Sequence, residues 1–92
     1  MKTVYVDNNA TTAIAPEVLG VMQPYLTSDY FNPSSMYDAA RSSAEAIESA
    51  RRTVASCLGG IDPDQIIFTG SATESNNAAL FGTVLANPKR RH

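Results

Sequence analysis

The sequence contains little of what several classes of protein require. Its single cysteine, Cys57, allows no internal disulfide and no cysteine cluster for zinc, so we expect no metal site. It has no stretch of the roughly 20 apolar residues that a membrane-spanning helix needs. Met1-Lys2 is followed by a short mixed segment and not by the long apolar core of a signal peptide. These absences predict a cytoplasmic protein with no membrane partner.

Charged residues are also sparse, and neither sign dominates. Seven lysines and arginines stand against nine aspartates and glutamates, which gives a formal net charge of -2. This balance argues against nucleic acid or an anionic membrane surface as the partner. The basic run Lys89-Arg90-Arg91 has a solvated loop as its simplest interpretation. With 92 residues, the chain is one domain at most.

Two segments have the composition of short β-strands, and three have that of helices. The β-prone runs are residues 2–6, which the turn-forming Asp7-Asn8-Asn9 ends, and residues 65–68. Helices are expected at residues 16–26, 36–58 and 78–85. In the first helix, Val18, Met22 and Leu26 form one apolar stripe, and we expect Pro24 to disturb the last turn.

Residues 36–58 form the longest expected helix. We expect it to pack through Ile47, Val54 and Leu58, with Ser34-Ser35 as the N-cap and Gly59-Gly60 as the stop signal. Its apolar face also contains alanines, and in full it consists of Ala40, Ala44, Ile47, Ala50, Val54 and Leu58.

A turn rich in small hydroxyl residues lies between the second β-prone run and the third helix. It reads Thr69-Gly70-Ser71-Ala72-Thr73-Glu74-Ser75-Asn76-Asn77. The first N–H groups of a helix have no internal partner, and the helix dipole favours negative charge there. The turn therefore suits a phosphate. The alternative is an ordinary helix cap by Ser71 or Thr73, with an acidic residue in the first turn.

The predicted elements make a poor complete domain. Two short strands far apart in the sequence offer little sheet, and a helix followed by a short basic loop normally leads into another strand of a βαβ unit. We therefore expect residues 1–92 to be a single truncated segment, the N-terminal fragment of a larger α/β protein.

Three blocks of the sequence resemble one family. Residues 5–12, Tyr-Val-Asp-Asn-Asn-Ala-Thr-Thr, are similar to the amino-terminal signature of cysteine desulfurases, which belong to aminotransferase class V. Asn32-Pro33-Ser34-Ser35 resembles a second block, which Glu48-Ser49-Ala50-Arg51 follows at a compatible spacing. Residues 65–77 resemble the third. The match covers nearly all of the chain but only about the first quarter of a family member.

The resemblance implies an α/β protein of fold type I that is helix-rich with few strands in this segment. Residues 1–92 would provide the N-terminal segment and the start of the large cofactor-binding domain. The cofactor of such enzymes is pyridoxal 5'-phosphate, held by a lysine. The family is homodimeric. It takes sulfur from L-cysteine, releases L-alanine and passes a cysteine-bound persulfide to a sulfur acceptor or an iron–sulfur scaffold protein.

The resemblance also implies roles for particular residues. Ala72, through its N–H, and Thr73, through its N–H and hydroxyl, would bind the cofactor phosphate. The loop that contains Asn8, Ala10 and Thr11 would border the substrate entrance, although a simple turn is the alternative there.

No catalytic residue of the family can be placed on this chain. Lys2 and Lys89 are its only lysines, and neither matches the position that holds the cofactor. Cys57 lies beside Leu58 on the apolar side of a helix, where we expect a small buried hydrophobe and not a nucleophile. The segment alone is therefore expected to be inactive.

Four positions depart from the family pattern. The family usually has Ser-Gly where this chain has Gly70-Ser71, and Ser71 must tolerate the dihedral angles of a tight turn. Glycine is common at the position of Phe31, and histidine at that of Tyr37, so the conformation of that loop is open.

Two other functions remain as alternatives. One is a small phosphate-binding module that uses the same turn, although the chain lacks the Gly-x-x-x-x-Gly-Lys-Ser/Thr pattern and has no Gly-x-Gly-x-x-Gly after its first strand. The other is a non-catalytic piece that folds against a partner.

Overall fold

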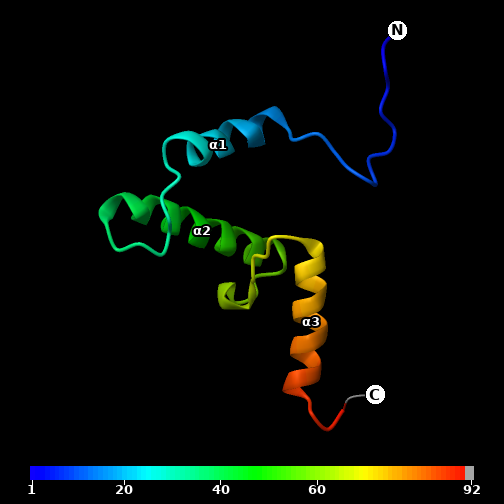
Figure 1. Cartoon of the computed structure of the whole chain (residues 1–92), viewed down its shortest axis with the longest axis vertical. Coiled ribbons are helices and arrows are strands. Elements are labelled where there is room, and N and C mark those ends of the chain that lie inside the picture. Colours follow the sequence, from blue (N-terminus) through cyan, green and yellow to red (C-terminus); the bar gives the residue numbers. More distant parts are fainter. Residues whose placement is uncertain (91–92) are drawn as a thin grey trace. The chain divides into compact units, whose positions relative to one another are not determined.

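The computed structural model describes residues 1–90, which form three α-helices and one 3-10 turn (Figure 1). The chain divides into two compact units, residues 1–50 and the residues from 51 onward. The first unit holds α1 (Pro16–Thr27) and the larger part of α2 (Asp38–Cys57). The second holds the end of α2, the 3-10 turn η1 (Pro63–Gln65) and α3 (Ala72–Ala86).

Helix α1 confirms the first predicted helix. Pro16 occupies the start of the helix, where its missing N–H costs nothing and its fixed φ suits the helix. The predicted disturbance at Pro24 does not end the helix, which continues to Thr27. The carbonyl oxygen of Pro24 accepts hydrogen bonds from the N–H groups of Ser28 and Asp29, at 2.9 and 2.8 Å, and these close the C-terminal end.

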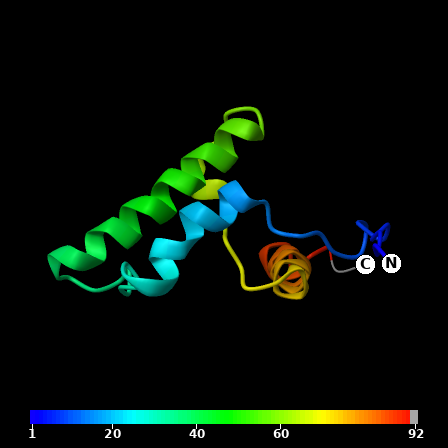
Figure 2. The ribbon, with the colours of Figure 1, turned by 90° about the horizontal axis from the view of Figure 1, so that it is seen from above.

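Helix α2 confirms the long helix and is seen lengthwise in Figure 2. It begins at Asp38, three residues after Ser35, so the predicted N-cap at Ser34-Ser35 is wrong. These serines belong to a preceding turn instead. The side-chain oxygen of Asn32 accepts a hydrogen bond from the N–H of Ser34, and its carbonyl oxygen accepts one from the N–H of Ser35, both at 3.0 Å. Asparagine often forms such turns by accepting a hydrogen bond with its side chain, and this local turn takes the place of a helix start at the two serines.

The buried residues of α2 are small. Ala40 and Ser43 are buried in the first unit and Ala55 in the second, and Ser43 donates a hydrogen bond of 3.0 Å to the carbonyl oxygen of Asp29. Small side chains at these positions allow another segment to approach the helix closely. Burial on α2 is therefore limited to small side chains.

The predicted packing of α2 through its aliphatic side chains is wrong within residues 1–90. Ile47 and Val54 are each 38% exposed, and Leu58 is 61% exposed. Cys57 is exposed as well, so the prediction of a buried cysteine is also wrong. Cys57 is the last residue of α2, so its side chain lies at the end of the helix.

Two glycines end α2, as predicted. Gly59 and Gly60 have φ angles of 91° and 74°, which an L side chain rarely adopts. The N–H of Gly60 donates to the carbonyl oxygen of Ala55 at 3.0 Å, and the N–H of Gly59 donates to that of Ser56 at 3.2 Å. These bonds satisfy carbonyl groups that the helix end leaves without partners.

Neither predicted strand forms within residues 1–90. Residues 2–6 and 66–69 have no regular secondary structure, although the backbone of Ile66 is extended at φ -90° and ψ 121°. A strand needs a neighbouring strand to take its backbone hydrogen bonds, and the described residues provide none. The expected α/β character is therefore not visible in this helix-rich segment.

Helix α3 begins at Ala72, earlier than the predicted start at residue 78, because the turn residues 72–77 are themselves helical. No residue of α3 is buried, and its aliphatic and aromatic side chains are exposed: Leu80, Phe81, Val84 and Leu85.

Candidate functional site

The candidate site is the N-terminal end of α3. Ser71 is the N-cap, with φ -164° and ψ 161°, and its hydroxyl oxygen accepts a hydrogen bond of 3.2 Å from the N–H of Glu74. This extended backbone is open to any residue, so Ser71 is accommodated where the family has glycine. The predicted cap by Ser71, with an acidic residue in the first turn, is confirmed.

Glu74 folds back over the turn. Its Oε2 accepts a hydrogen bond of 2.8 Å from the N–H of Gly70. Together with the Ser71 cap, this bond pairs two N–H groups in the manner of a capping box, although here the acceptor reaches the residue before the cap. A Cβ at Gly70 would lie 3.3 Å from Oε2 of Glu74, so glycine at this position leaves room for the carboxylate.

A hydroxyl pair joins the incoming segment to the helix. Oγ of Ser75 and Oγ1 of Thr69 lie 2.5 Å apart. Thr69 also donates from Oγ1 to the carbonyl oxygen of Ser71 at 3.0 Å. The half-buried Thr69 therefore contacts both the cap and the first turn of α3. These contacts connect the incoming segment to the start of α3.

Two donors at this end of the helix have no acceptor among the residues that the structure describes. Within residues 1–90, no hydrogen bond from the N–H of Ala72 or Thr73 is found, and both residues are exposed. They are among the first N–H groups of α3, where the helix dipole places partial positive charge. The Thr73 hydroxyl is on the same turn. This set of donors has the chemistry that holds one phosphate group, so the site fits a phosphorylated cofactor.

The hollow beside this turn is shaped by the segment that precedes it and by one face of α3. Gln65 and the hydroxyl pair of Thr69 and Ser75 are its polar lining residues. Its lining residues are Gln65, Ile67, Thr69, Ser75, Ala78 and Ala79.

The residues of the predicted substrate entrance lie in a turn of the first unit. The carbonyl oxygen of Asp7 accepts hydrogen bonds from the N–H groups of Ala10 and Thr11, at 3.0 and 3.4 Å, and from the hydroxyl of Tyr5 at 2.9 Å. Asn8, Ala10 and Thr11 are all exposed. The turn at this position is confirmed, and the role of its side chains at a substrate entrance stays a prediction.

Arg51 reaches the segment that leads into the site. Its Nη1 donates a hydrogen bond to the carbonyl oxygen of Ile66, and its Cζ lies 5.2 Å from the centroid of the Phe68 ring. Sequence reasoning missed Arg51, because its helical position gives no sign of which loop it contacts. Sequence reasoning also missed the bond from Gly70 to Glu74, although the Ser-x-x-Glu pattern at residues 71–74 is the signal for it.

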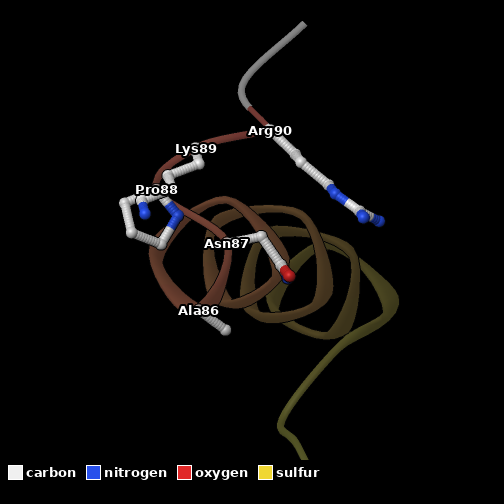
Figure 3. Close-up of a pocket in the computed structure, with 5 residues that line it drawn as sticks. All are labelled: Ala86, Asn87, Pro88, Lys89 and Arg90. Carbon is white, nitrogen blue, oxygen red and sulfur yellow. The ribbon is translucent and has the colours of Figure 1, made fainter.

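A second hollow lies at the opposite end of α3 (Figure 3). Consecutive residues of one turn form it, and the side chain of Arg90 extends away from the helix end. The side chain of Asn87 caps the helix instead, because its Nδ2 donates a hydrogen bond of 3.0 Å to the carbonyl oxygen of Thr83. Within residues 1–90, no groups from other elements line this hollow, so we treat it as a helix end and not as a candidate site.

The described part of the chain contains neither a cluster of metal-binding side chains nor a helix that could span a membrane. Among residues 1–90, no three histidine, cysteine, aspartate or glutamate side chains gather in a way that could hold a metal ion. None of the helices within this range combines the length and apolar character that crossing a membrane would demand.

The chain is similar to known cysteine desulfurases. It is 46% identical over 92 residues to the cysteine desulfurase of Trichormus azollae and 47% identical over 91 residues to that of Enterobacter agglomerans. It is 44% identical over 86 residues to the cysteine desulfurase IscS of Methanosarcina thermophila. These alignments cover 100%, 99% and 94% of the chain but 23%, 23% and 21% of the relatives.

The chain thus spans just under a quarter of the length of these curated relatives. No solved structure matches it. The family model described as aminotransferase class-V matches residues 4–91, which include both the N-terminal turn and the start of α3. This chain belongs to the class-V aminotransferase family.

Proposed function

We propose that this chain is part of a pyridoxal 5'-phosphate-dependent cysteine desulfurase. In that enzyme, residues 1–92 supply the N-terminal segment and the beginning of the large cofactor-binding domain of a fold type I protein. The observation that carries the proposal is the pair of N–H groups at Ala72 and Thr73, which have no acceptor within residues 1–90. These donors occur in a chain that resembles cysteine desulfurases over its whole length.

The chain's own contribution is to bind and orient the cofactor. The N–H groups of Ala72 and Thr73 and the Thr73 hydroxyl would hold the phosphate, and the positive end of the α3 dipole would favour its charge. When bound, the cofactor supplies an electron sink for breaking the carbon–sulfur bond of L-cysteine. The hydrogen bonds of Ser71, Glu74 and Thr69 within the turn would lower the conformational entropy lost on binding.

The substrate and partners follow from the same proposal. L-cysteine would enter past the turn that contains Asn8, Ala10 and Thr11. The enzyme would be a cytoplasmic homodimer that releases L-alanine and passes its sulfur to an acceptor or iron–sulfur scaffold protein. Residues 1–92 should release no sulfur alone, because they contain no lysine or cysteine at a matching catalytic position.

The test compares the full-length protein with residues 1–92. Each is titrated with pyridoxal 5'-phosphate by absorbance, and alanine and sulfide are then measured after L-cysteine and a reductant are added. We expect turnover by the full-length protein alone. Turnover by residues 1–92 that is abolished by Cys57→Ala would contradict the proposal. Binding of inorganic phosphate without any alanine would favour a simple phosphate-binding module.

A further inference from the structure

Arg51 contacts two residues of the segment that enters the proposed phosphate site. Its guanidinium donates to the carbonyl oxygen of Ile66 and lies over the ring of Phe68, 5.2 Å from Cζ to the centroid. One side chain from α2 therefore contacts both the backbone of this segment, at Ile66, and a side chain of it, at Phe68.

Little else within residues 1–90 holds the segment. No neighbouring strand pairs with residues 66–69, so their backbone lacks the ladder that normally fixes a strand's register. Ile66 is buried, at 9% exposure, but Ile67 and Phe68 are 78% and 49% exposed. The half-buried side chain of Arg51 is thus a main constraint on the position of residues 66–68 relative to the end of α2.

The residue after Phe68 connects this segment to the site. Thr69 contacts the carbonyl oxygen of Ser71 at 3.0 Å and the hydroxyl of Ser75 at 2.5 Å. A shift of Phe68 along α2 would therefore move Thr69, and with it the cap of α3. Donors that bind one phosphate together must keep their relative positions, because charge-assisted hydrogen bonds weaken with poor geometry.

We infer that Arg51 is a positioning residue for the phosphate site. By holding Ile66 and Phe68, it sets where the turn at residues 69–71 places the N–H groups of Ala72 and Thr73. The inference rests on the proposed function, since it assumes that this turn binds the phosphate of pyridoxal 5'-phosphate. Arg51 itself does not touch that phosphate.

The experiment measures dissociation constants for pyridoxal 5'-phosphate and for pyridoxal, which lacks the phosphate, in the full-length protein. Arg51→Met keeps the length of the side chain and removes the guanidinium. Arg52→Met is the matched control, because Arg52 is the next residue of α2 and is exposed. Circular dichroism and the thermal midpoint of each variant report whether the fold survives.

We expect Arg51→Met to weaken pyridoxal 5'-phosphate about tenfold, the lower end of the loss seen at metal sites when a group that orients a ligand residue is removed. Pyridoxal binding should stay unchanged, and Arg52→Met should match the parent with both ligands. Arg51→Lys should recover part of the loss, because an ammonium can reach the carbonyl oxygen of Ile66 but lacks the planar fork.

A second variant tests the same contact from the other side. Phe68→Leu keeps an apolar side chain and removes the ring under the guanidinium, and it should weaken pyridoxal 5'-phosphate in the same direction. Because both changes break one contact, the double variant Arg51→Met, Phe68→Leu should lose less affinity than the two single losses combined.

Three results would overturn the inference. Arg51→Met could bind pyridoxal 5'-phosphate as tightly as Arg52→Met, or it could weaken pyridoxal equally, which would indicate a general loss of structure. In both cases a parent protein that prefers pyridoxal 5'-phosphate would leave the proposed function standing. A parent protein that binds the two ligands equally would refute the phosphate site itself, and with it the role of Arg51.

Discussion

The N–H of Gly70 donates a hydrogen bond of 2.8 Å to Oε2 of Glu74, across the turn that begins α3. A Cβ on Gly70 would lie 3.3 Å from that oxygen. The next residue, Ser71, caps the helix with its hydroxyl. The order Gly70-Ser71, which departs from the family's Ser-Gly, therefore places the small residue beside the carboxylate and the hydroxyl at the cap.

Glu74→Ala should lower the free energy of unfolding by about 0.5–1 kcal/mol. The change removes an acceptor of the Gly70 N–H and a negative charge from the first turn of a helix. Glu45→Ala is the control, since Glu45 is exposed and lies in the interior of α2. Urea unfolding followed by circular dichroism measures both. Equal losses for the two variants would show that the bond to Gly70 contributes nothing.

Ser71→Ala should destabilise the chain by about 1 kcal/mol, whereas Ser71→Gly should cost only a few tenths. Alanine removes the hydroxyl that accepts from the N–H of Glu74, while glycine lets water reach that N–H. The family's usual residue at this position would thus be tolerated. Thermal unfolding of the two variants separates them, and a larger loss for glycine than for alanine would contradict the capping role.

Thr73→Val should weaken pyridoxal 5'-phosphate more than Ser75→Ala does in the full-length protein. The hydroxyl of Ser75 pairs with that of Thr69, so its loss should affect the turn and not the ligand directly. A hydrogen bond to a charged group is worth roughly 1.5–3 kcal/mol, which raises the dissociation constant about ten- to a hundredfold.

Titration of each apo variant with pyridoxal 5'-phosphate makes this comparison. If Thr73→Val binds like the parent and Ser75→Ala does not, then the wrong hydroxyl has been placed at the phosphate. If neither change matters, the turn is only a helix cap.

Gly59→Ala should destabilise the chain by about 1 kcal/mol, while Gly82→Ala should stabilise it by about 0.5–1 kcal/mol. Gly59 has a φ of 91°, which strains any side chain even though a Cβ there would contact nothing within 4 Å. Gly82 lies inside α3 with open space around it, so alanine adds helix propensity without strain. Opposite effects of the same substitution on the free energy of unfolding would show that backbone conformation, and not packing, decides the outcome. Denaturant unfolding measures both variants, and a loss of stability in both would contradict this reasoning.

The loop departures Phe31 and Tyr37 contact each other. Their ring centroids are 6.2 Å apart at an interplanar angle of 81°, and Tyr30 stacks on Phe31 at 5.7 Å. The sequence marked both positions as unusual but gave no reason to link them. Only the fold shows that the two aromatic residues form one edge-to-face pair in the loop before α2.

Local signals in the sequence were sufficient for the presence of the three helices and for some of their ends, although the starts of α2 and α3 differ from those predicted. The stripe of Val18, Met22 and Leu26, the stop at Gly59-Gly60 and the cap at Ser71 depend on residues within a few positions of one another. Helix formation and capping are local interactions, so neighbouring residues determine them. Residues 69–77 also predict a phosphate site from local chemistry alone, and that site stays a prediction.

Tertiary structure decided what depends on distant residues. The strand expected at residues 65–68 does not form, because a strand needs hydrogen bonds from another segment and residues 1–90 supply none. Ile47, Val54 and Leu58 stay exposed for the same reason, since an apolar stripe is buried only when another element covers it. The contact from Arg51 to Ile66 and Phe68 joins residues at least 15 apart along the chain, and no periodicity in the sequence encodes it.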